Sequence, residues 1–320
     1  MRRLILLLFT CALLTLQGCA SCPRQDPPEP TQALAFNAAT PIYRLAPAGH
    51  EALSLAEYQS QLASWLPGRA PAVLFVHGRG KEPTKSVYGQ TGIASGRALQ
   101  HLTDRGLRPW MFNWDSAADG LDRSCPLAKT DDAVDPFWQL LQFHAALRAQ
   151  QPALPRPVLL VHSMGAIVLQ KVIQQHGWPA TAPGDRLFER IVFSEPDADE
   201  RDHVRWLTRL AQREEVWVTW NRGDVTLNFA TDAREAGEGA LGLGVPYNRP
   251  LAPGVRYLDL SHTGCWRGWL NHTVFVAGSF GYAPTTDAFL GRLLAGHPID
   301  PDHDRAIERR DERGVIRLKP

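Results

Sequence analysis

The sequence predicts an α/β protein in which a mostly parallel sheet carries helices on both faces. From residue 41 onward, short apolar runs alternate with longer segments of helical spacing, as in repeated β-α units. Runs such as residues 72–77 and 158–162 are apolar at nearly every position, as strands buried on both faces must be. Polar residues directly follow several of these runs, and the carboxyl ends of parallel strands are where such proteins bind ligands.

Each expected strand is a short run of β-branched, aromatic or other apolar residues. We place strands at residues 42–45, 72–77, 109–114, 158–162, 191–193, 216–220 and 255–260. Each expected helix has apolar residues three and four positions apart, which gives it one apolar face. We place helices at residues 53–65, 93–102, 137–147, 166–175, 204–211 and 288–294, with a short helical stretch opening at His272.

Length and composition favour one main domain. The chain has 320 residues, 44% of them hydrophobic, and a net charge of +1, which suits a single domain with a sizeable core. We place this domain at residues 41–296 and expect residues 297–320 to form a charged, solvated tail. The near-neutral charge gives no support to nucleic-acid binding, which calls for a basic face. The sequence does not indicate an oligomeric state.

The N-terminus predicts a targeting segment. Arg2 and Arg3 precede an apolar stretch at residues 4–16, which is shorter than the roughly 20 residues that span a bilayer but typical of a secretory signal. The stretch ends in Leu16-Gln17-Gly18-Cys19, which resembles the lipobox of bacterial lipoproteins. The resemblance implies that residues 1–18 are removed as a signal peptide and that Cys19 is acylated.

A lipid at Cys19 would anchor the protein to a membrane without a spanning helix. Ala20 stands where lipoproteins retained in the inner membrane often carry Asp, so the resemblance implies the outer membrane. Residues 19–40 are rich in Pro, Gln and Ala and lack apolar periodicity, which predicts a flexible tether. The alternative is an ordinary signal peptide, cut near Ala20 by a different peptidase.

Three cysteines remain in the mature chain besides the proposed anchor, namely Cys22, Cys125 and Cys265. An oxidising compartment permits disulfides. Cys125 and Cys265 could form one disulfide and leave Cys22 in the tether, but the sequence does not establish the pairing.

Ser163 is the candidate nucleophile. It follows the apolar run at residues 158–162 and comes just before a helical segment. A sharp turn from strand to helix exposes a serine Oγ and requires small neighbours. Gly165 supplies the last position of the G-x-S-x-G pattern, but Val161 stands where the first glycine is usual. The alternative is a serine that only caps the following helix.

A serine hydroxyl needs a base, and the base needs a carboxylate that orients it. Where the serine occupies such a turn, the acid and then the histidine follow it in the chain. Asp224 and Asp197 both come after expected strands, and we prefer Asp224 with Asp197 as the alternative acid. We prefer His272 as the base, because His262 lies very close to the last strand. Either aspartate would otherwise form a turn or cap a helix.

The oxyanion that forms during attack needs preorganised donors. One is expected from the backbone N–H of Met164, directly after the nucleophile, and the other from the N–H of Arg79. Gly78 and Gly80 flank Arg79 and allow the backbone to approach a substrate closely. A phosphate-binding loop is disfavoured because this turn lacks the Gly-Lys-Ser/Thr ending.

Several motifs now point to a family. They occur in the order Phe75-Val76-His77-Gly78, Phe112-Asn113-Trp114, His162-Ser163-Met164-Gly165, Pro196-Asp197, Asn221-Arg222-Gly223-Asp224 and Asn271-His272. Together they resemble the α/β-hydrolase superfamily, most of all a poorly characterised bacterial branch of the esterases and lipases known as a domain of unknown function. The resemblance spans residues 41–296 and implies an α/β-hydrolase fold with a triad of Ser163, Asp224 and His272. Val161 departs from the family pattern, in which a small residue is usual, and its branched side chain must fit beside the following helix in the serine turn.

We therefore expect a serine hydrolase that cleaves a carboxylic ester or related acyl bond through an acyl-serine intermediate on the cell envelope. Its substrate would be a small-molecule or lipid-like acyl ester, and this chemistry needs no metal or organic cofactor. Loops at residues 116–135 and 232–254 would shape the entrance. An acyltransferase would use the same residues. The alternative from another class is a catalytically silent envelope lipoprotein with a binding or assembly role, which a serine turn closed by Val161 would favour.

Overall fold

The computed structural model of the protein describes most of the chain after the N-terminal segment. The described residues are 42–46, 49–64, 71–79, 95–116, 124–232, 239–263, 272 and 284–319. The predicted signal peptide, Cys19, the tether and Cys265 lie outside these ranges, so the lipid anchor stays a prediction and the pairing of Cys125 with Cys265 stays open. Within the described ranges, no helix combines the length and the apolar character that a membrane crossing needs.

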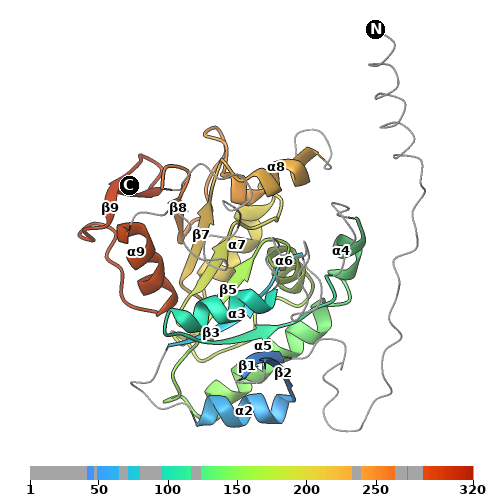
Figure 1. The fold of residues 1–320 in the computed structure, drawn as a ribbon. Helices are drawn as coiled ribbons and strands as arrows, with labels where there is room; N and C mark the ends of the chain where they lie inside the picture. The colour runs from blue at the N-terminus through green and yellow to red at the C-terminus, as the bar shows by residue number, and fades with distance from the viewer. Residues whose placement is uncertain are drawn as a thin grey trace, which may run out of the picture.

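The described residues form one ten-stranded sheet (Figure 1). In spatial order its strands are β2 (Gly49–Leu53), β1 (Ile42–Ala46), β4 (Arg108–Phe112), β3 (Ala72–Val76), β5 (Val158–His162), β6 (Ile191–Ser194), β7 (Val216–Trp220), β8 (Val255–Asp259), β10 (Ile316–Leu318) and β9 (Ile307–Arg310). Neighbouring strands pair in parallel from β4 to β10, and the antiparallel pairs lie at the two edges. The predicted fold class is confirmed.

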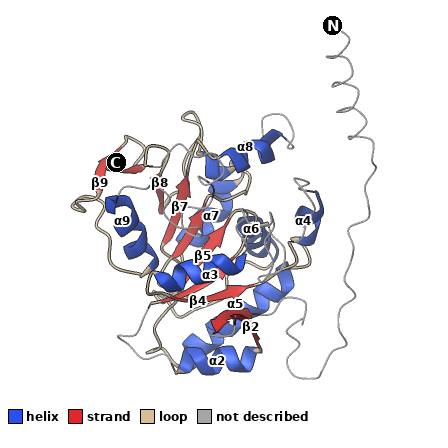
Figure 2. Cartoon of the chain, in the orientation of Figure 1, coloured by secondary structure: helices blue, strands red, loops and turns tan. Residues whose placement is uncertain are grey.

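Helices cover both faces of this sheet (Figure 2). They are α2 (Leu55–Ala63), α3 (Ser95–Asp104), α4 (Ser124–Lys129), α5 (Val134–Gln150), α6 (Gly165–Gln175), α7 (His203–Ala211), α8 (Val225–Asp232) and α9 (Pro284–Leu294), with a short 3-10 turn, η1, at Leu241–Leu243. Apolar residues of α2, α5, α6 and α7 share one core cluster, and those of α3 and α9 share a second. The two clusters occupy opposite faces of the sheet.

The strand that leads to Ser163 shows why the central runs are apolar throughout. Leu159 and Val161 belong to the cluster that α6 shares, whereas Val158 and Leu160 belong to the cluster under α3 and α9. Successive side chains of a strand point to opposite faces, and here both faces are covered. Alternating polar residues would therefore be buried without partners.

Local signals set the boundary between β2 and α2. Ser54 caps α2, because its hydroxyl accepts from the Glu57 N–H and the Glu57 carboxylate accepts from the Ser54 N–H. The helix expected from residue 53 therefore begins two residues later. Strand β2 pairs with β1 in a hairpin that the sequence analysis did not predict, and α4 lies in a segment that we expected to be a loop.

The C-terminal segment differs most from its expected form. We expected residues 297–320 to be a charged, solvated tail, and this expectation is wrong. β10 pairs in parallel with β8, and β9 pairs with β10. Ile316 and Leu318 are each only 1% exposed, while Arg317 between them lies on the other face. The alternation of apolar and charged residues has the period of a strand, but the charges on either side conceal it.

Candidate active site

Ser163 lies at the turn between β5 and α6, at the carboxyl edge of the sheet. Its backbone adopts the left-handed conformation, with φ at 53°, which costs a non-glycine residue about 1–3 kcal/mol. Backbone hydrogen bonds hold it there. The Ser163 N–H donates to the Ser194 carbonyl over 3.1 Å, and the Ser163 carbonyl accepts from the Asp197 N–H over 3.0 Å. The strained turn expected from the sequence is present.

Two glycines let the chain approach this serine closely. A Cβ added at Gly165 would lie 2.8 Å from the His77 carbonyl oxygen, and one added at Gly78 would lie 2.6 Å from the Ser163 Cβ. Both distances are too short for a side chain. Val161, in the place of the usual first glycine, is fully buried in the core that α6 shares. The turn therefore forms with a valine at that position.

Ser163, His272 and Asp224 come together from three distant segments. His272 Nε2 lies 3.0 Å from Ser163 Oγ, and His272 Nδ1 lies 2.6 Å from Asp224 Oδ2. With its proton on Nδ1, the imidazole donates to the carboxylate and accepts from the serine hydroxyl. All three side chains are buried. This arrangement can remove the serine proton and stabilise the imidazolium that results.

Asp224 uses its two carboxylate oxygens for two different partners. Oδ2 meets His272, while Oδ1 accepts from the Leu227 N–H over 2.9 Å in the first turn of α8. Helix capping was the alternative role for this aspartate, and the structure combines it with the histidine contact. Since α8 starts at Val225, the cap also fixes the carboxylate at the carboxyl end of β7.

The other candidate acid and base lie elsewhere. Asp197 is buried, and its backbone N–H donates to the Ser163 carbonyl, but the carboxylate hydrogen-bonded to His272 is that of Asp224. His262 is exposed at the end of β8. Of the pairs weighed from the sequence, Asp224 with His272 is the one that meets Ser163.

Opposing effects act on the pKa of His272. Burial lowers the pKa, but the negative charge of Asp224 and the hydrogen bond to its carboxylate raise it more, and the pKa ends above its ordinary value. A base with a raised pKa holds a serine proton more readily. Because of the same shift, His272 becomes protonated at a higher pH than an ordinary histidine when the pH falls, and it then loses its neutral, reactive form.

His162 precedes the nucleophile but contacts the base. Its Nε2 donates to the His272 carbonyl over 2.8 Å, and the two ring centroids lie 4.9 Å apart. Burial, and then the charge of His272, lower the pKa of His162 to about 3. The ring therefore stays neutral and acts as a fixed donor. The sequence does not indicate this role of His162, since no local pattern shows which distant carbonyl a side chain reaches.

The two residues expected to supply oxyanion donors both lie next to segments that contact the nucleophile. Met164 is buried at the N-cap of α6, and Arg79 follows Gly78, whose backbone packs against the serine. His77 holds this loop, since its Nδ1 donates to the Gly78 carbonyl over 2.7 Å and its carbonyl accepts from the Trp114 indole N–H over 2.8 Å. These contacts restrain the backbone that carries the Arg79 N–H.

Glu195 is a buried carboxyl group beside this site that the sequence analysis did not assign to it. The residue follows β6 with φ at 42°, and its side chain is fully buried. Its oxygens accept from the hydroxyls of Ser194 and Thr219. Burial raises the pKa of Glu195 to about 8, so the carboxyl is protonated at neutral pH. The sequence does not indicate this burial, because a glutamate followed by a proline is typical of an exposed turn.

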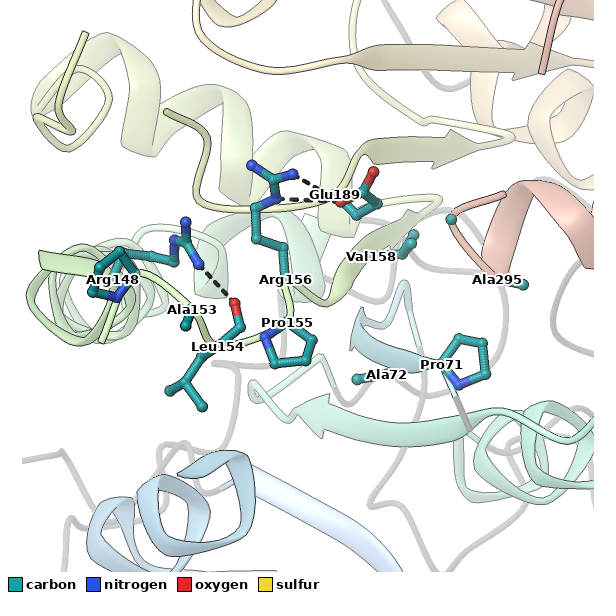
Figure 3. Close-up of a pocket in the computed structure, with 12 residues that line it drawn as sticks. Pro71, Ala72, Arg148, Ala153, Leu154, Pro155, Arg156, Val158, Glu189 and Ala295 are labelled. Atoms are coloured by element: carbon teal, nitrogen blue, oxygen red, sulfur yellow. Dashed lines mark hydrogen bonds and ion pairs between the residues drawn. The ribbon is translucent and has the colours of Figure 1, made fainter. Parts of the chain in front are cut away.

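A separate cavity of about 580 Å³ lies at the opposite edge of the sheet (Figure 3). Ala72 and Val158, the first residues of β3 and β5, line it. Its cations have protein partners: Arg156 pairs with Glu189 at 3.2 Å, and Arg148 donates to the Leu154 carbonyl over 2.7 Å. The cavity takes no part in the site at Ser163. In the described part of the chain, no group of three or more His, Cys, Asp or Glu could hold a metal ion.

The fold and the site define a class of protein. A mostly parallel sheet with the serine turn after β5, an aspartate after β7 and a histidine after β8 is the arrangement of the α/β-hydrolases. The chain belongs to the family described as "Alpha/beta hydrolase of unknown function (DUF900)", whose model matches residues 56–277. The match confirms the resemblance drawn from the motifs. No match was found among the curated proteins.

Several solved structures are distantly similar. A predicted CIB-like hydrolase from Thermoplasma acidophilum is 15% identical, with a TM-score of 0.33 over 71% of this chain and 89% of that one. A serine hydrolase without a lid from Xanthomonas campestris is 15% identical, with a TM-score of 0.31 over 74% and 88%. An α/β serine hydrolase homologue from Coxiella burnetii is 11% identical, with a TM-score of 0.28 over 60% and 77%.

Proposed function

We propose that this protein is a serine hydrolase that cleaves a carboxylic ester or a related acyl bond through an acyl-serine intermediate. The observation that carries the proposal is the hydrogen-bonded chain from Ser163 through His272 to Asp224, with distances of 3.0 and 2.6 Å. Membership of an α/β-hydrolase family supports it. A serine hydroxyl without such a base is a weak nucleophile at neutral pH.

In the first half-reaction, Ser163 Oγ forms a bond to the acyl carbon, and its proton passes to His272 Nε2. The N–H groups of Met164 and Arg79 bind the oxyanion that develops, where one such donor contributes about 3 kcal/mol. When the tetrahedral intermediate collapses, the bond to the leaving alcohol breaks, and His272 returns the proton to the alcohol oxygen. Asp224 stays ionised and stabilises the imidazolium between these two transfers.

In the second half-reaction, water takes the place of the alcohol. His272 removes a proton from water as its oxygen attacks the acyl carbon, and then protonates Ser163 Oγ as the acyl–oxygen bond breaks. The products are a carboxylic acid and the free enzyme. If an alcohol attacks instead of water, the same residues carry out acyl transfer, so the acceptor distinguishes a hydrolase from an acyltransferase.

A fluorophosphonate probe, which reacts with activated serines, tests the proposal. We expect it to label the full-length protein purified in detergent, and to fail with Ser163→Ala and with His272→Ala. Ser64→Ala, at the exposed end of α2, is the matched control and should label like the wild type. A folded wild-type protein that is not labelled would favour the silent binding lipoprotein. Labelling that survives Ser163→Ala would overturn the site.

We also propose that the protein is anchored to the cell envelope through a lipid on Cys19. The support is the lipobox-like ending of the apolar N-terminal stretch, and the anchor would place the site near lipid-like acyl esters. Cys19→Ser should move the protein from the membrane fraction to the soluble fraction, whereas Cys22→Ser should leave it at the membrane. Retention of Cys19→Ser in the membrane would contradict the anchor.

A further inference from the structure

A second cavity, of about 730 Å³, lies at the same edge of the sheet as Ser163. Arg222, in the turn before Asp224, contributes to one side, and Arg317 of β10 contributes to another. Arg317 is in register with Asp259, the last residue of β8, which places this wall at the carboxyl edge. Figure 1 shows β9 and β8 close to the C-terminus.

The lining of this cavity carries an excess of positive charge. It contains five arginines, against the two carboxylates of Asp311 and Glu312. Oδ1 of Asp311 already accepts from two backbone N–H groups of the β9–β10 turn. Arg310 pairs with Asp302, which lies outside the lining, at 2.7 Å. The remaining arginines outnumber the carboxylates that could neutralise them.

Two of these arginines face one another across the hairpin. Arg309 of β9 is directly opposite Arg317 of β10 in the antiparallel register, and like charges in directly opposed positions destabilise a sheet. Arg317 forms an ion pair with Asp259, with 3.4 Å between Nε and Oδ2. Arg309 and Arg222 form no ion pair with any residue that the structure describes. A dianion between these guanidinium groups would remove the repulsion.

An aromatic and apolar wall adjoins the arginines. Tyr247 is 61% exposed, which is unusual for a large ring, and the Arg313 guanidinium lies 4.7 Å from its centroid. Arg313 is held in place because its Nη1 donates to the Pro246 carbonyl over 3.1 Å. Leu243 and Val245 extend the wall. The cavity therefore combines cationic donors with a surface for an apolar or ring-shaped group.

From these observations we propose that the cavity binds a phosphate monoester, with the phosphate against Arg222, Arg309 and Arg317 and the organic part against Tyr247. A phosphate dianion has enough oxygens to accept from several guanidinium forks at once, whereas one arginine satisfies a carboxylate. The volume is in the range of small-molecule sites and leaves room beyond the phosphate. The proposal does not depend on hydrolysis at Ser163. Its test measures binding, so the result does not depend on whether Ser163 is catalytic.

Calorimetric titration of the full-length protein with phenyl phosphate tests the site. We expect one molecule to bind per chain, and the affinity to fall at least about tenfold in Arg222→Gln and in Arg309→Gln, as the loss of a charged hydrogen-bond donor predicts. Arg209→Gln, an exposed arginine on α7 outside the cavity, should bind like the wild type. No binding by the folded wild type, equal weakening by Arg209→Gln, or benzoate binding as tightly as phenyl phosphate would overturn the proposal.

Thermal unfolding without ligand distinguishes a binding arginine from a structural one. Because Arg309 opposes Arg317, Arg309→Gln should unfold at the same temperature as the wild type or at a higher one, and a clear drop would count against the site. A second titration uses monomeric dihexanoyl phosphatidic acid to identify the source of the phosphate. Tighter binding than phenyl phosphate points to a lipid head group and weaker binding to a soluble ester, and both outcomes support the site.

Discussion

Nε2 of His162 donates a hydrogen bond to the carbonyl oxygen of His272 over 2.8 Å. The residue beside the nucleophile thus holds the backbone of the proposed base, while Asp224 holds its ring. Two contacts, one from the last residue of β5 and one from the turn between β7 and α8, therefore set the imidazole relative to Ser163. Positioning of this kind matters because small displacements of a reacting group cost large factors in rate.

His162→Leu removes this contact and leaves the His272 carbonyl unpaired. We expect kcat on a chromogenic ester to fall about tenfold, in line with the loss of one buried hydrogen bond. In a His272→Ala background, His162→Leu should change the residual rate little, because there is no longer a base to position. Equal losses in both backgrounds would show that His162 acts on the fold rather than on His272.

Asp224→Asn keeps the size of the side chain and removes its charge. We expect kcat to fall about a thousandfold or more, because the imidazole loses both the orientation of its Nδ1 proton and the partner of its imidazolium form. Asp197→Asn is the comparison, since that carboxyl is the alternative acid, and it should cost far less. Equal losses in the two variants, measured with the same ester, would contradict the assignment of Asp224.

The pH dependence of kcat/KM should report His272. Its neutral form is the base, and its pKa lies above the ordinary 6.5 because Asp224 outweighs burial. Activity should therefore rise with pH, with a midpoint above 6.5. In Asp224→Asn the negative charge that raises the pKa of His272 is absent. Burial then lowers this pKa, so the midpoint of the pH profile should move down. A wild-type midpoint below that of the variant would be the opposite of this prediction.

Glu195→Gln should change how stability depends on pH. The pKa of Glu195 is about 8 in the folded protein and near 4.5 in the unfolded chain. Between these values the folded protein holds a proton that the unfolded chain has lost, so the free energy of unfolding falls as pH rises. The glutamine variant lacks this titration and should gain stability relative to the wild type, by a few kcal/mol across the window. Urea unfolding at both ends of the window measures it, and Glu308→Gln on exposed β9 should show no such gain.

Ile316→Ala tests the role of the C-terminal strands. Ile316 is 1% exposed on β10, and truncating a buried isoleucine costs about 2–5 kcal/mol. Glu308→Ala, on an exposed position of β9, should be close to neutral. Chemical denaturation of both variants gives the comparison. Equal stability of the two variants would contradict the packing of β10 in the core and would support the solvated tail that the composition suggested.

Some of the architecture follows from the sequence alone. β5 and β7 have the predicted bounds, Val158–His162 and Val216–Trp220, because strands covered on both faces must be apolar at nearly every position. The positions of Ser163 and Asp224 likewise follow from where those strands end. Such features are local or depend on chain order, so one sequence displays them.

Other features were decided only by the tertiary structure. The aspartate that His272 contacts, the carbonyl that His162 reaches and the burial of Glu195 all depend on which segments pack together. The same is true of β10, whose apolar residues become core only because β8 offers a free edge for pairing. A residue's burial and its partners are properties of the groups around it, and a sequence pattern records the residue without those groups.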